Sequence, residues 1–313
     1  MINRRKFILG SALVAAGTSG CIAARRRFGS TSTTNSVSGK TAPADIHRLV
    51  QFGWETVFQD EPLLSGVTPL LEKLQLSDPV SALKGSSAGK HKTLAFGGER
   101  SLGAVVWTDW GDGPLPPQLG WEQDPSITEH THAGKTLYRA DELAAARLDG
   151  GAIGIGTEST VDTLLERWSE TVTEAAGVVS THTAASREAD IRFSIKDSEN
   201  TNADQLSLDQ RTPEVYGSIQ RADEDIRAKV NLNMKLPEQT DAVVSDIEST
   251  VVQLLCSANG GCDPRRAGDE IPGFDTNRRF GAADIEYRAT ADEFPNDGET
   301  VLRGILRGMT EGS

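Results

Sequence analysis

The stretch that decides the fold is Ile226–Leu236, IRAKVNLNMKL, in which apolar and polar side chains alternate without interruption. Because successive side chains of a β-strand point to opposite faces, this pattern predicts one long strand with a buried face and a wet face. Parallel sheets are covered by helices on both faces, whereas antiparallel sheets often leave one face in water. The stretch therefore favours an antiparallel sheet that is covered on one side only.

The segments around this strand continue the same pattern. Apolar side chains recur at helical spacing over residues 243–254, and this amphipathic helix would cover the buried face. The other elements expected in this half are strands over 191–195, 215–219 and 283–289 and a closing helix over 301–309.

The first half of the chain has a similar order of elements. The expected strands are 46–58, 93–96, 102–107, 136–139, 143–148 and 152–156, and the expected helices are 67–76 and 159–175. The alanine-rich segment 143–148 also allows a helix. Both halves thus contain three strands followed by a helix, at an offset of about eighty residues, and internal duplication is a hypothesis that this order of elements suggests. The predicted class is α+β: antiparallel sheets with helices packed on one face, for which the repeated order suggests two related β-β-β-α subdomains.

The N-terminus carries two adjacent motifs. Arg4, Arg5 and Lys6 precede an apolar run of ten residues, Ile8–Gly17. A membrane-spanning helix needs roughly 20 apolar residues, so the run is typical of the core of a signal peptide. The residues that follow, Thr18–Cys21, have the composition of a lipobox.

In this segment the chain resembles the twin-arginine-exported lipoproteins of the haloarchaeal type. The resemblance implies that the twin-arginine (Tat) translocase recognises Arg4 and Arg5, and that cleavage before Cys21 leaves a covalent lipid on that cysteine. It places the protein on the extracytoplasmic face of the membrane. The rest of the chain resembles no family.

These motifs divide the chain into four expected parts. Residues 1–20 are the signal peptide, and residues 21–44, rich in Ser and Thr, form a tether with little apolar content to bury. Residues 45–184 and 185–313 are the two α+β subdomains. The Ser/Thr density also suits a glycosylated stalk.

The charge of the chain limits its partners. Asp and Glu number 45 against 32 Lys and Arg, and removal of Arg4, Arg5 and Lys6 changes the formal net charge from −13 to −16. A nucleic-acid-binding face needs clustered positive charge, so nucleic acid is not an expected partner. Arg outnumbers Lys by 22 to 10 and the acidity is spread along the chain, as on the surfaces of salt-loving proteins.

Two cysteines remain once Cys21 is assigned to the lipobox. Cys256 and Cys262 flank the segment SANGG, whose glycines can bend a short loop. An exported chain meets an oxidising environment, so a Cys256–Cys262 disulfide is predicted. A metal site is less favoured because no histidine lies nearby in the sequence.

His130 and His132 form the one histidine pair of the sequence. On a strand they would face the same side, where both imidazoles reach one metal ion with Glu129 or Asp124 nearby. A third ligand is not identifiable, so a solvated pair of histidines is the main alternative. No cofactor other than the lipid is predicted.

Three tryptophans, Trp107, Trp110 and Trp121, lie within fifteen residues of one another. They would form an aromatic platform for a sugar or another flat ligand, or cover a thin core. The glycine-rich segment Gly150–Gly156 does not have the order of a phosphate-binding loop, and small residues on a strand under a helix explain it better. Segment 197–204 offers oxygen ligands for calcium, without the glycine and glutamate of a calcium loop.

No catalytic constellation emerges from the sequence. The leading hypothesis is therefore a lipid-anchored extracytoplasmic protein with a binding or scaffolding role at the cell surface. One alternative is a secreted metal-dependent hydrolase that uses His130 and His132. Another is a solute-binding lipoprotein, which is disfavoured because alternating parallel strands and helices are missing.

Overall fold

The computed structural model describes residues 41–83, 89–121, 124, 126–169, 177–185, 189–196, 211–258 and 271–310. All of them belong to one unit, Val37–Ser313. The export signal, Cys21, Cys262 and the segment 197–204 lie outside the described residues. Within them, no helix is both long enough and apolar enough to span a membrane.

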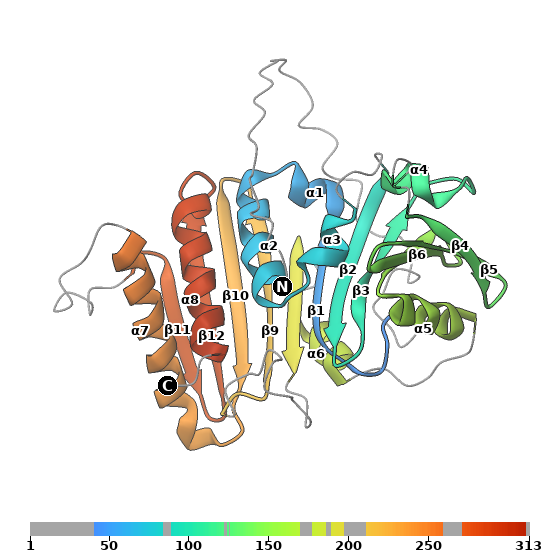
Figure 1. Cartoon of the computed structure of the whole chain (residues 1–313). Coiled ribbons are helices and arrows are strands. Elements are labelled where there is room, and N and C mark those ends of the chain that lie inside the picture. Colours follow the sequence, from blue (N-terminus) through green and yellow to red (C-terminus); the bar gives the residue numbers. More distant parts are fainter. Residues whose placement is uncertain are drawn as a thin grey trace, which may run out of the picture. The chain divides into compact units, whose positions relative to one another are not determined.

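The described strands form one antiparallel sheet of twelve strands, in the order β11-β12-β10-β9-β8-β1-β2-β3-β7-β6-β5-β4 (Figure 1). On one side of the centre lie β1 (Ile46–Gly53), β2 (Lys90–Gly98), β3 (Leu102–Thr108), β4 (Thr128–His132), β5 (Lys135–Ala140), β6 (Leu143–Arg147) and β7 (Ala152–Gly156). On the other side lie β8 (Ile191–Lys196), β9 (Glu214–Ala222), β10 (Asp225–Asn233), β11 (Phe274–Arg279) and β12 (Ala282–Thr290).

The sheet is continuous across the predicted subdomain boundary at residue 184. The first strand, β1, pairs with β2 on one side and with β8 on the other, so that Val50 lies opposite both Ala95 and Phe193. The subdomain boundary itself stays a prediction.

The strand of the deciding stretch is confirmed as β10. Its burial alternates residue by residue, with Ile226, Ala228, Val230 and Leu232 buried. The strand ends at Asn233, three residues earlier than the pattern predicts, because Pro237 opens the short helix η2 (Pro237–Gln239). Proline has no backbone N–H for a sheet hydrogen bond, which favours this end.

Helices pack on both faces of the sheet. The first core cluster contains buried residues of α1 (Trp54–Phe58), α2 (Glu61–Lys73), α3 (Ser77–Ser81), α4 (Leu115–Leu119), α7 (Thr240–Ala258) and α8 (Glu299–Thr310), and of the π-helical turn η4 (Phe294–Gly298). The second cluster contains those of α5 (Glu158–Ser169) and α6 (Gly177–Ala184). Neighbouring residues of β2, such as Leu94 and Ala95, belong to different clusters, so the clusters lie on opposite faces.

The predicted α+β class is therefore confirmed. Placing all helices on one face was too simple, because α5 and α6 cover the face opposite to α7. The sequence shows that a helix is amphipathic, but the connecting loops decide on which face it packs. The helices of the two predicted β-β-β-α units thus lie on different faces.

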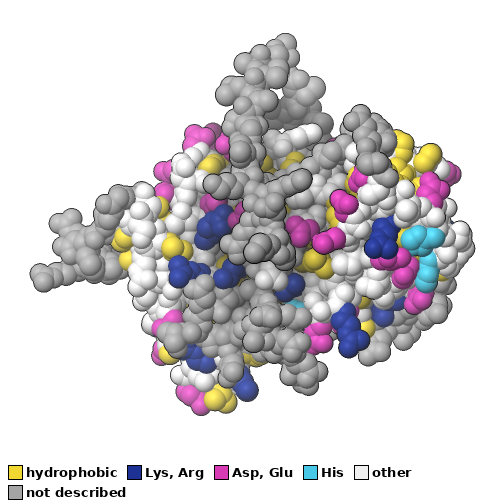
Figure 2. All heavy atoms as spheres, viewed as in Figure 1, with side chains coloured by type: hydrophobic (Ala, Val, Ile, Leu, Met, Phe, Trp, Pro, Cys, Tyr) yellow, Lys and Arg dark blue, Asp and Glu magenta, His cyan; other side chains and the backbone are white. Residues whose placement is uncertain are grey.

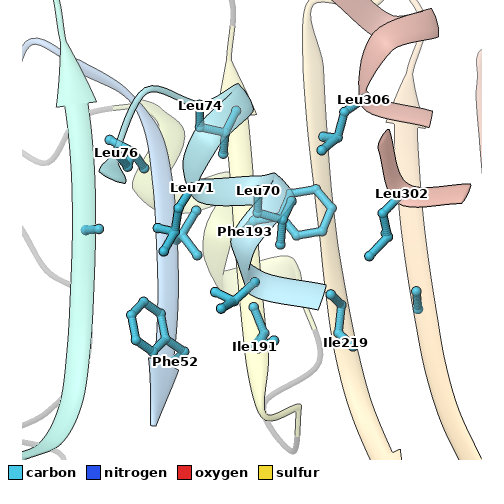
Figure 3. Close-up of a cluster of buried hydrophobic side chains, with 14 of the residues drawn as sticks. Phe52, Leu70, Leu71, Leu74, Leu76, Ile191, Phe193, Ile219, Leu302 and Leu306 are labelled. Atoms are coloured by element: carbon cyan, nitrogen blue, oxygen red, sulfur yellow. The ribbon is translucent and has the colours of Figure 1, made fainter. Parts of the chain in front are cut away.

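The centre of the first core joins both halves of the chain. In Figure 3, Leu70 of α2 lies beside Phe193 of β8. Leu71 of α2, Leu74 directly after the helix and Phe52 of β1 belong to the same cluster. The side chain of Asp60 caps α2 by accepting a hydrogen bond from the backbone N–H of Leu63, at 3.3 Å.

The segment 46–58, predicted as one strand, is a strand followed by a helix. β1 ends at Gly53, and α1 begins at Trp54. The rings of Trp54 and Phe58 stack with centroids 4.3 Å apart, and both contact Phe52. Ring centroids this close between residues four positions apart require a helix, because in a strand the two side chains would lie about 13 Å apart. The mixed pattern of the sequence reflects this change of period.

Candidate functional site

The sheet has a polar face, formed by the side chains that point away from α7 and α8 on β8 to β12. It consists of two register rows, Arg192, Ser218, Lys229, Glu286 and Asp275 in one and Ser194, Tyr216, Asn231, Asp284 and Asn277 in the other, with Gln220, Arg227 and Arg288 beside them. Arg227, Lys229 and Arg288 are exposed. Among the described residues, the one-sided cover that the deciding stretch predicts is thus present over β10, β11 and β12, whereas α6 packs against β8 and β9.

Cross-strand contacts hold the open part of the polar face in place. Nε of Arg227 donates to Oε1 of Glu286 at 2.6 Å, and Nη2 of Arg279 lies 2.6 Å from both carboxylate oxygens of Asp284. Nδ2 of Asn233 donates to Oε2 of Glu214 at 2.7 Å. Positive, negative and amide groups therefore alternate in fixed positions across neighbouring strands.

A buried polar network closes the other end of the polar face, under α6. His182 is 1% exposed; its Nε2 lies 3.0 Å from Oε1 of Gln51 and its Nδ1 lies 3.3 Å from Oγ of Ser194. Arg192 donates to the same oxygen of Gln51. Burial, followed by the nearby charges of Arg192 and Lys92, lowers the pKa of His182 to about 3. The imidazole is therefore neutral at ordinary pH and joins α6 to β1 and β8.

Lys92 lies next to this network on β2. Burial, followed by the charge of Arg192, lowers its pKa to about 8. Its ammonium group lies 5.8 Å from the ring centroid of Trp107, within the range of a cation–π interaction. Sequence analysis missed Lys92, Arg192 and His182, because only the pairing of β1 with both β2 and β8 brings them together.

The predicted histidine pair lies on β4, which is the edge strand farthest from β11 in the strand order. Nε2 of His130 is 3.1 Å from Oε1 of Glu158, whereas His132 places Nδ1 3.4 Å from Asp162 and Nε2 3.4 Å from Glu166. All three acids belong to α5. Figure 2 shows histidine atoms beside acidic ones at this end of the sheet.

The acids around these histidines differ from those expected. The partners come from α5, at four-residue spacing along one face of the helix, rather than from Glu129 or Asp124. Asp124 accepts hydrogen bonds from the backbone N–H and the hydroxyl of Ser126. Across the part of the chain that the structure describes, no group of three or more His, Cys, Asp and Glu side chains is arranged to hold a metal ion.

The three tryptophans do not form a platform. Trp107 is 5% exposed and belongs to the second core cluster, whereas Trp110 and Trp121 are half-buried against the first. The two clusters lie on opposite faces of the sheet. The three rings instead cover the core, which was the alternative expectation.

The glycine-rich segment 150–156 forms a turn and the strand β7, as expected. A Cβ atom on Gly154 would lie 3.0 Å from a methyl group of Leu164 in α5. Glycine thus allows α5 to approach the strand closely. For the predicted disulfide, Cys256 lies in the last turn of α7, and the pairing stays a prediction because Cys262 is outside the described residues.

Comparison with known proteins gives no assignment. No family model matches the sequence, and no curated protein matches it. Crystal form I of TP0453 is similar with a TM-score of 0.46 and 9% sequence identity, over 85% of this chain and 98% of that one. Crystal form III of TP0453 has a TM-score of 0.49 and 9% identity, over 84% of this chain and 98% of that one. These values are too low to carry an argument about fold or activity.

Proposed function

We propose that the protein is a lipid-anchored, extracytoplasmic binding or scaffolding protein that uses the polar face to contact a protein partner. The observation that carries this proposal is the open polar face itself, with Arg, Lys, Asn, Tyr and carboxylate side chains in fixed register. Protein interfaces combine such hydrogen-bonding groups with charge complementarity, which sets specificity and orientation.

The ordered contacts of the polar face support binding more than catalysis. A surface whose side chains are already held in place loses little conformational freedom when a partner docks. Arg227 and Glu286 illustrate this, because each is fixed by the other at 2.6 Å. His182 has a structural role here, since it is 1% exposed and both of its ring nitrogens face side chains of the sheet, Gln51 and Ser194.

The location is part of the proposal. Arg4 and Arg5 would direct export through the twin-arginine translocase, and the lipid on Cys21 would hold the folded part through the tether of residues 21–44. The acidic composition supports an environment of high salt, which screens repulsion between carboxylates. The predicted Cys256–Cys262 disulfide fits an oxidising compartment.

Two variants test the location. Replacing Arg4 and Arg5 by Lys should stop export, and Cys21→Ser should release the protein from membranes, because lipid chains provide the anchor. Protein found on the outer surface in the double Lys variant would contradict the twin-arginine signal. Membrane retention of Cys21→Ser would contradict the lipid anchor.

A photoreactive amino acid tests the polar face in living cells. Placed at Ser218 or Asn231, it should crosslink to one defined protein; placed at the exposed Ser245 of α7, it should not. Lys229→Glu should reduce the crosslink at Ser218 by reversing a charge in the same register row. Absence of a crosslink from both polar-face positions, or equal crosslinks from Ser245, would refute the proposed surface.

A further inference from the structure

Two large hydrophobic side chains are exposed within the described residues, and they lie on adjacent turns. Phe280, in the turn between β11 and β12, is 93% exposed, and Leu236, after β10, is 45% exposed. The backbone N–H of Met234 donates to the carbonyl oxygen of Gly281 at 2.9 Å, which joins the two turns. We call Leu236 and Phe280 the apolar tip.

The apolar tip and the start of β1 lie at the same end of the sheet, where end means the side on which the strands begin or finish. The strand register connects them in one row: Arg48 pairs with Ile195, Ile195 with Val215, Val215 with Leu232, Leu232 with Ala283, and Ala283 with Arg278. β1 runs away from this end, and β11 runs toward it. Both ends lie at the lower edge of the sheet in Figure 1.

This placement brings the apolar tip within reach of the lipid. The chain from Cys21 enters the sheet at Ile46, and its 25 residues can extend over roughly 80 Å. Five strand spacings separate β1 from β11, or about 24 Å along the hydrogen-bonding direction. The tether is therefore long enough for the end with the apolar tip to face the membrane surface.

Residues beside the apolar tip suit a membrane surface. Lys235 and Arg279, which directly precede Leu236 and Phe280, are both exposed. Aromatic side chains insert at the boundary between headgroups and acyl chains, and neighbouring cations contact lipid phosphates. Although Arg279 is paired with Asp284, its guanidinium retains further N–H donors.

We propose that the apolar tip inserts into the membrane interface next to the lipid anchor. This inference rests on the proposed lipidation of Cys21. The tip and the lipid are two attachment points on one membrane, so the end of the sheet that carries Leu236 and Phe280 faces the membrane and the polar face is turned sideways to partners. Either attachment point alone would leave the folded part free to rotate.

A fluorescent label next to the tip tests this inference. The full chain, exported and lipidated in its host, carries Arg279→Cys labelled with an environment-sensitive dye and is reconstituted on vesicles of equal parts phosphatidylglycerol and phosphatidylcholine. The dye should shift to the blue and be quenched by brominated lipid. Adding Leu236→Ser and Phe280→Ser should reduce this quenching at least about tenfold, because the apolar area that drives insertion is lost.

The control label is placed at Ala222, an exposed residue at the opposite end of β9. It should stay in water in both backgrounds. Protein that co-sediments with vesicles while the dye at position 279 stays in water would overturn the tip and leave the lipid anchor intact. A blue shift without vesicles that grows with protein concentration would indicate self-association and also overturn the tip. Failure to co-sediment would remove the anchor and the inference together.

Discussion

His182 of α6 and Gln51 of β1 lie 131 positions apart in the sequence, yet Nε2 of one is 3.0 Å from Oε1 of the other. The contact is buried and makes the stability of the protein depend on pH. The folded state keeps the pKa of His182 at about 3, against 6.5 as the ordinary value. Between these values the unfolded chain binds a proton that the folded chain does not, so stability is lost as the pH falls from 6.5 toward 3.

The variant His182→Gln tests this dependence, because glutamine keeps hydrogen-bonding groups and does not titrate. Over that acid range the free energy of unfolding should fall more steeply for the wild type than for the variant, by up to about 1.4 kcal/mol per pH unit. Urea unfolding at several pH values measures both slopes. Parallel curves of unfolding free energy against pH would mean that His182 binds its proton as readily in the folded as in the unfolded chain.

Gly304 of α8 lies directly against α7. A Cβ atom at this position would approach Cα of Val251 to 2.8 Å, and one on Gly308, a turn later, would approach Cα of Ile247 to 3.0 Å. Gly304→Ala should destabilise the protein by about 1 to 2 kcal/mol although alanine favours helices, and Gly304→Leu by about 3 kcal/mol. Thermal unfolding measures both; Ser257→Ala, on an exposed position of α7, should change little. A stabilised Gly304→Ala variant would show that the helices can separate without cost.

Asp60 has two roles at the start of α2. It caps the helix, and its Oδ2 lies 2.6 Å from Nη1 of Arg221 in β9. Asp60 is 11% exposed, so the pair is better shielded than a surface ion pair. Asp60→Ala should cost about 2 to 3 kcal/mol and Asp60→Asn about half of that, because asparagine retains the cap. Equal losses, measured by denaturant unfolding, would assign the whole effect to the ion pair.

The histidine contacts of β4 should contribute little to stability. His132 and its partners Asp162 and Glu166 have side chains that are 32% to 61% exposed. His132→Ala should therefore lower the free energy of unfolding by less than about 1 kcal/mol. Bound-metal analysis of the purified protein tests the hydrolase alternative: stoichiometric zinc that disappears in His130→Ala and His132→Ala would favour a metal site there over the ion pairs.

The predicted disulfide can be tested independently of function. The intact protein should gain two hydrogen masses on reduction, and peptide mapping should join Cys256 to Cys262. Because the closed loop is short, its loss in the double Ser variant should cost only about 2 kcal/mol. Two alkylated thiols in the untreated, exported protein would be evidence against the crosslink.

Local patterns predicted most of the elements near the C-terminus. Strict alternation identified β10 and β12, and helical spacing identified α7 and α8, because each buries one face against a single layer. The hairpin of β2 and β3 and the strand β6 were also predicted correctly. The short helix α6 was not predicted, although both Val178 and Val179 are buried in it.

The candidate site was much harder to predict than the fold. The open face of β10 follows from its own alternation, whereas the network of His182, Gln51 and Arg192 depends on pairing between distant strands. The order of strands in a sheet is not encoded in the period of any one of them. The histidine pair and the tryptophans were chosen as candidates because these residue types are rare in the sequence. Their rarity does not indicate which residues lie near them in the fold.

The central position of β1 has a consequence for how such a protein can evolve. The strand that enters the sheet first borders partners from both halves of the chain. A fragment ending before β8 would carry a bare, apolar strand edge, which invites aggregation. Neither half can therefore be lost, duplicated or exchanged by recombination without exposing an edge of β1. We expect the two halves to be inherited together.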